Sequence, residues 1–144
     1  MRNILNTGKQ ILVLLMVTAG CFLNSSCEEE ELNIQDNFPF GVSVMPVPDE
    51  IADEQTVELR FTIQPTGNYS NTRYFIRYFQ FEGQGTLQYF DDPPYLPNDL
   101  YELPDLQFRL YYTSASVLSQ SFDVWISDNF GNERQVSFQF NSSD

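Results

Sequence analysis

The side chains with the clearest capacity for chemistry are carboxylates in one proline-rich segment, residues 91–105. Carboxylate oxygens are the ligands that Ca²⁺ prefers, and the ion takes about six to eight of them. The spacing here matches no EF-hand loop, and prolines separate the acidic residues irregularly. We therefore favour a solvated loop over a calcium site and predict no metal or cofactor. The carboxylates concerned are Asp91, Asp92, Asp99, Glu102 and Asp105.

Other groups that could support catalysis are scarce. The chain has no histidine, which removes the commonest general base and metal ligand. Its one lysine is Lys9, so Schiff-base and phosphate-loop chemistry lack their usual residue. Residues 82–86, EGQGT, lack phosphate-loop spacing and predict a hairpin turn instead. No pair of carboxylates is singled out as an acid and a base, so we predict no catalytic residues and no enzymatic activity.

Cys27 lies between an apolar run and four glutamates, in the stretch LNSSCEEEE. Arg2 and Lys9 precede an apolar stretch that is too short to span a bilayer, as in a secretory signal peptide. The small residues before the cysteine resemble a bacterial lipobox, which implies cleavage at that point and lipidation of Cys27. Cys21 follows VTAG and is the alternative.

Three segments follow from this interpretation. Residues 1–26 are a lipoprotein signal peptide, residues 27–39 an acidic tether, and residues 40–144 a single domain. The glutamates keep the tether solvated, and resemblance to some surface lipoproteins implies a display signal as the other interpretation. Without residues 1–26, five arginines face twenty carboxylates, a net charge of −15. This charge repels phosphate backbones, so no direct nucleic-acid partner is predicted.

Alternation of apolar and polar residues recurs after the tether and predicts half-buried β-strands. A segment near 73–82 is apolar on both faces, and a short strand near 86–90 is expected to pair with it. Residues 120–141 should form a hairpin, because DNFGN supplies turn residues between two alternating segments. The alternating segments are 40–44, 57–63, 106–112, 122–126 and 136–140.

These segments amount to about seven strands over one domain. We predict an all-β, immunoglobulin-like or fibronectin-III-like β-sandwich, with a small barrel as the alternative. The core must hold without a disulfide if Cys27 is acylated, but the many aromatic residues can bury enough apolar area.

Several stretches together resemble the TraQ family of Bacteroides-type conjugative transposons. They are TRYFIRYFQFEGQGTL, LPNDLYEL, FRLYYTSAS and DVWISDNFGN, and the resemblance extends over about residues 32–142. The combination is more specific than any one stretch. It implies a small lipid-anchored or periplasmic β-sandwich protein encoded among conjugation genes, and it supplies no catalytic residues.

Candidate partner-binding residues are large side chains that lie out of phase with the buried stripes. Tyrosine, tryptophan and arginine are the types that dominate interface energetics. A structural role in covering the second sheet is the alternative. Arg73 and Arg77 are expected to pair locally with carboxylates. The candidates are Tyr74, Tyr78, Arg109, Tyr111 and Trp125.

The sequence thus predicts a non-enzymatic envelope lipoprotein at the outer membrane, on its periplasmic face or at the cell surface. The resemblance implies protein partners in the conjugative transfer apparatus. A surface module that binds glycans or mediates cell contact is the alternative.

Overall fold

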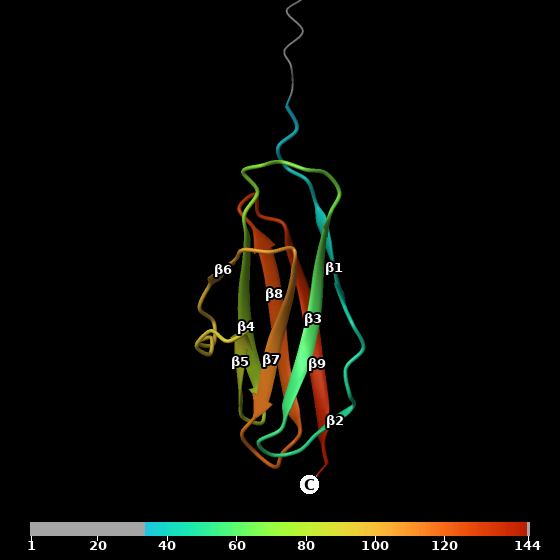
Figure 1. Ribbon diagram of the computed structural model, residues 1–144, viewed down its shortest axis with the longest axis vertical. Coiled ribbons are helices and arrows are strands. Elements are labelled where there is room, and N and C mark those ends of the chain that lie inside the picture. Colours follow the sequence, from blue (N-terminus) through green and yellow to red (C-terminus); the bar gives the residue numbers. More distant parts are fainter. Residues whose placement is uncertain (1–33, 144) are drawn as a thin grey trace, which may run out of the picture. The chain divides into compact units, whose positions relative to one another are not determined.

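A computed structural model of the chain describes residues 34–143 (Figure 1). The predicted signal peptide, both candidate lipidation cysteines and most of the acidic tether lie outside the described residues. Within residues 34–143, no helix is long and apolar enough to cross a membrane.

The described residues form nine strands and no helix. The strands are β1 (Phe40–Val44), β2 (Glu50–Ile51), β3 (Thr56–Pro65), β4 (Tyr74–Glu82), β5 (Gly85–Tyr89), β6 (Tyr101–Leu103), β7 (Gln107–Ser114), β8 (Gln120–Asp128) and β9 (Glu133–Ser142).

Two sheets make up the fold, in the orders β1-β3-β7-β5 and β2-β9-β8-β4-β6. All neighbours are antiparallel except β2 and β9, which run parallel. The predicted all-β sandwich is confirmed, as is the hairpin of β8 and β9. The two strands beyond the expected seven are β2 and β6. They are too short to show alternation.

The alternating residues of both sheets meet in one aromatic core. Phe61 and Phe108 stack within the four-stranded sheet at 5.2 Å between ring centroids. Tyr112 of the same sheet stacks on Phe122 of the other sheet at 4.2 Å. All four side chains are buried, so aromatic contacts join the two layers without a disulfide.

The connection from β4 to β5 differs from the prediction. Only Gly83 and Gln84 separate these strands, yet β5 pairs with β7 in the other sheet. The expected hairpin at EGQGT and the expected pairing of residues 86–90 with β4 are therefore wrong. The chain crosses between layers here. Gly83 has φ of +73°, and a Cβ on it would lie 2.3 Å from the Gln120 side chain, so the crossing requires glycine.

The proline-rich segment 91–105 is fixed to both sheets. The Tyr95 backbone N–H donates to the carbonyl of Leu87 in β5 at 2.7 Å. The Asn98 N–H donates to the carbonyl of Tyr78 in β4 at 2.9 Å. Because Tyr95 is buried and stacks on Tyr101 at 4.3 Å, this segment closes one side of the sandwich (Figure 1).

Candidate functional site

Two of the predicted partner-binding residues lie in the core. Tyr74 and Tyr78 are only 7% and 2% exposed, so the expectation that they lie off the buried stripe is wrong. Arg77 lies between them in β4 and faces the other side of the sheet together with Phe75. Charged side chains are rarely buried, so the position of Arg77 indicates which face of this strand, apolar on both sides, is exposed to solvent.

The other three candidates lie on opposite outer faces. Arg109 and Tyr111 project from β7 on the four-stranded sheet, whereas Trp125 projects from β8 on the five-stranded sheet. The five predicted residues therefore do not converge into one aromatic patch.

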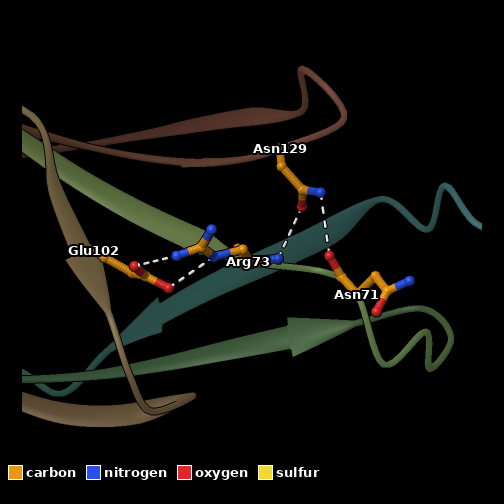
Figure 2. Close-up of polar contacts among 4 residues, drawn as sticks. All are labelled: Asn71, Arg73, Glu102 and Asn129. Atoms are coloured by element: carbon orange, nitrogen blue, oxygen red, sulfur yellow. Dashed lines mark hydrogen bonds and ion pairs between the residues drawn. The ribbon is translucent and has the colours of Figure 1, made fainter.

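Arginines are scarce in this acidic chain, so their partners are informative. Figure 2 shows Arg73 in a two-pronged ion pair with Glu102, at 2.9 and 2.5 Å. The Arg73 backbone N–H donates to Asn129 Oδ1 at 2.8 Å, and Asn129 Nδ2 donates to the Asn71 carbonyl at 3.1 Å. The Arg73 hydrogen bond lowers the pKa of Glu102. The predicted pairing of Arg73 with a carboxylate is confirmed, and it ties β6 to the β8–β9 turn.

Two further arginines lie over aromatic rings. The Arg77 guanidinium lies 4.6 Å from the centre of the Trp125 ring, directly across the strand pair. Arg134 lies 5.8 Å from the centre of the Phe40 ring. Within residues 34–143, Arg77 forms no ion pair with a carboxylate, so the expected pairing is wrong there and the cation–π contact takes its place.

The remaining two arginines face each other on the four-stranded sheet. Arg60 of β3 is the direct cross-strand partner of Arg109 of β7. The row extends to both sides, because the Met45 N–H donates to the Arg60 carbonyl at 3.1 Å and the Phe90 N–H to the Arg109 carbonyl at 3.2 Å. Two cations thus occupy the middle of the outer face, with an apolar residue on either side.

Both arginines share one carboxylate. Arg60 Nε donates to Glu58 Oε1, and Arg109 Nε lies 3.7 Å from the same oxygen. The Tyr111 hydroxyl donates to Glu58 Oε2 at 3.4 Å. The hydrogen bond from Arg60 is the main cause that lowers the pKa of Glu58. The cluster therefore keeps one excess positive charge.

The arginine pair lines a depression of about 320 Å³, which we call the arginine face. Thr62 and Gln107 form its side opposite Glu58, and they are also direct cross-strand partners. Chemically the depression offers guanidinium donors, one hydroxyl, one amide and apolar walls. It can bind an anionic group. The residues of the arginine face are Met45, Arg60, Thr62, Phe90, Gln107 and Arg109.

Sequence reasoning predicted only Arg109 of this set. Alternation already assigns Arg60 and Thr62 to the outer face of their strand. The position of Arg60 opposite Arg109 depends on the register between β3 and β7, and these strands lie far apart in the chain.

The acidic segment does not gather its carboxylates. Glu102 is held by Arg73, and Asp105 accepts a hydrogen bond from the Tyr89 hydroxyl at 3.0 Å. Within residues 34–143, no three carboxylates come together in a geometry that would hold a metal ion.

The two-layer sandwich defines a small all-β domain that presents its polar groups on outer sheet faces. The chain belongs to the TraQ conjugal transfer protein family, which it matches over residues 10–143. The resemblance seen in the sequence is therefore confirmed, and it supports a role in conjugative transfer.

Three solved structures are similar to this chain. A conjugative transposon lipoprotein from Bacteroides eggerthii is 46% identical with a TM-score of 0.69, over 74% of this chain and 100% of that chain. A lipoprotein from Bacteroides thetaiotaomicron is 45% identical with a TM-score of 0.68, over 80% and 88%. A conjugate transposon protein from Bacteroides vulgatus is 48% identical with a TM-score of 0.66, over 78% and 91%. A search of the curated proteins found no match.

Proposed function

We propose that this protein is a non-enzymatic lipoprotein of the cell envelope that supports conjugative transposon transfer through protein–protein contacts. The match to the conjugal transfer family over residues 10–143 carries the proposal. Two of the similar solved proteins are described as lipoproteins, and two are described as products of conjugative transposons.

The residue types on the outer faces of the sandwich support a role in protein–protein contact. Arg109 and Tyr111 on one sheet and Trp125 on the other are residue types that dominate interface energetics. We take these three as the remaining candidate contact residues. Tyr74 and Tyr78 are buried and are no longer candidates.

The N-terminal segments provide the attachment to the membrane. We propose that residues 1–26 are removed, that Cys27 is acylated, and that residues 27–39 tether the domain that begins at residue 40. Metabolic labelling with palmitate tests this. Cys27→Ser should abolish incorporation, whereas Cys21→Ser should not. The reverse result would make Cys21 the acylated residue. Protease treatment of intact cells then distinguishes the cell surface from the periplasmic face of the outer membrane.

Deletion of the gene in a donor strain tests the role in transfer. Transfer frequency should fall, and expression of the wild-type chain should restore it. Transfer that is unchanged by deletion would contradict the proposal. Specific retention of the protein on a glycan array, together with unchanged transfer, would favour the glycan-binding alternative.

A further inference from the structure

The arginine face holds more positive charge than its surroundings neutralise. Like charges directly opposite each other on neighbouring strands destabilise a sheet, yet Arg60 and Arg109 occupy such positions. Within residues 34–143, Glu58 is the one carboxylate that pairs with them. We propose that the arginine face binds a partner protein through a single Asp or Glu side chain flanked by apolar residues. This inference rests on the proposed function, because it specifies the chemistry of the contact.

The free donors of the arginine pair point to a carboxylate. Both contacts to Glu58 use the Nε atoms. Within residues 34–143, no other group accepts a hydrogen bond from either guanidinium. The terminal nitrogens therefore remain for a ligand, and the side chains are 51% and 48% exposed. A guanidinium matches the two oxygens of a carboxylate in one plane.

The charge balance indicates one carboxylate. Two guanidiniums and Glu58 leave one excess positive charge, which one bound carboxylate neutralises. A run of acidic residues is disfavoured, because the whole chain carries a net charge of −13 and would repel the additional charges. The same repulsion disfavours a phosphate group, which carries more charge than one carboxylate.

The walls of the depression indicate which residues of the partner protein lie next to that carboxylate. Met45 and Phe90 flank the two arginines, and both are large exposed apolar side chains. Phe90 has φ of +45°, a conformation that is costly for a bulky residue and that is often found at ligand-binding sites. Apolar side chains on either side of the bound carboxylate would bury this exposed surface.

Fluorescence anisotropy on the full-length chain in detergent micelles tests the proposal. The probes are rhodamine-labelled heptapeptides with a central Asp or Glu, flanked on both sides by Phe, Leu, Val or Met. Each acidic peptide has a twin with Asn or Gln at the centre. At least one acidic peptide should bind about tenfold or more tightly than its twin.

Variants then assign the binding to the arginine face. The double variant Arg60→Gln, Arg109→Gln should lose about tenfold or more in affinity. Arg109→Lys should lose part of it, because lysine keeps the charge without the planar fork. The single variant Arg109→Gln should also lose affinity. Arg134→Gln removes the same single positive charge, but at the Phe40 ring, and should bind as the wild type does. Circular dichroism and thermal unfolding confirm that each variant is folded.

Equal binding of acidic peptides and their twins would overturn the inference. Unchanged binding by the double variant, or an equal loss with Arg134→Gln, would overturn it as well. Self-association that the double variant abolishes, without peptide binding, would overturn it in favour of a second copy as the occupant. Gene deletion separates the two proposals. If deletion lowers transfer but no acidic peptide binds, the contact chemistry is wrong and the role in transfer stands.

Discussion

Two polar clusters in this domain differ in how many of their hydrogen-bonding groups find partners within the domain. Gln120 is fully buried. It accepts hydrogen bonds from the Tyr112 hydroxyl at 2.7 Å and from Gln80 Nε2 at 3.0 Å. Its own Nε2 donates to the Leu118 carbonyl at 2.7 Å. The pair of Arg60 and Arg109 is half exposed and shares a single carboxylate.

Polar groups that stabilise the fold can thus be distinguished from polar groups that are free to bind a partner. The Gln120 cluster joins β4, β7 and β8 and fixes the loop before β8 through groups of the domain itself. Within residues 34–143, Gln80 Oε1 is the one buried side-chain polar atom that has no hydrogen-bond partner. Burial raises the pKa of Tyr112 to about 12, so its hydroxyl stays a donor. The arginine pair retains unused donors at the surface, as an interaction site requires.

The largest effect is expected from Gln120→Ala. The substitution strands the hydroxyl of Tyr112 and the loop carbonyl of Leu118 in a buried position, so we expect a loss of about 2–3 kcal/mol in the free energy of unfolding. Urea denaturation measures it. Gln139→Ala on the exposed face of β9 is the matched control and should stay within about 0.5 kcal/mol of wild type. Equal effects at both positions would contradict the structural role of the buried cluster.

An intermediate case is the contact between Arg77 and Trp125, where a ring takes the place of a carboxylate. We expect Trp125→Ala to cost about 1–2 kcal/mol, because it removes the cation–π contact and an aromatic cross-strand neighbour. Trp125→Phe should cost less, since a ring remains below the guanidinium. Denaturant unfolding checks both. If the two variants lose the same stability, the ring does not hold Arg77.

The same variants sharpen the assignment of function. Trp125 is one of the three candidate contact residues, so Trp125→Ala should lower transfer further than the loss of folded protein explains. A drop in transfer that only follows the protein level on immunoblots would remove the five-stranded face from the contact surface.

The strands that form the core were predictable from sequence. Alternation identifies β3, β7, β8 and β9, and the turn residues at 128–132 identify the hairpin. The pairing of β5 was not predictable. A two-residue connection normally joins neighbouring strands of one sheet. The β4–β5 connection crosses between the two sheets instead, and this crossing depends on how Gly83 packs against Gln120.

The arginine face shows the same limit. Alternation places Arg60 and Arg109 on outer faces, but no tight turn joins β3 to β7, so the sequence does not show that these two strands pair. The juxtaposition requires the register Arg60 to Arg109 between β3 and β7, and a shift by one residue would turn the side chains of one strand to the other face.

A smaller effect is expected from Glu58→Gln, which removes the carboxylate shared by the arginine pair. Two facing guanidiniums then repel each other, and the melting temperature should fall by about 2 °C or less. Adding Arg109→Gln should recover the loss, because the repulsion disappears. Differential scanning calorimetry of the single and double variants measures this coupling. Additive effects would mean that Glu58 does not shield Arg109 from Arg60.

The smallest effect is expected from pH. Hydrogen bonds from Arg60 and Arg73 lower the pKa values of Glu58 and Glu102 below 4.5. A carboxyl whose pKa is lower in the folded state stabilises that state fully above 4.5, and the contribution is lost as the pH falls through the folded value. The melting temperatures of wild type and a Glu58→Gln, Glu102→Gln variant should therefore converge as the pH falls from about 6 through the folded-state pKa values.

The two proteins differ only at Glu58 and Glu102, so the difference between their melting temperatures isolates the two ion pairs. Both pairs are partly exposed, so about 1 M salt should also reduce the difference near neutral pH. A difference that persists at low pH would show that the glutamates act through packing rather than charge. In that case Glu58 would be a structural group like Gln120, and the contrast between the satisfied and the available cluster would fail.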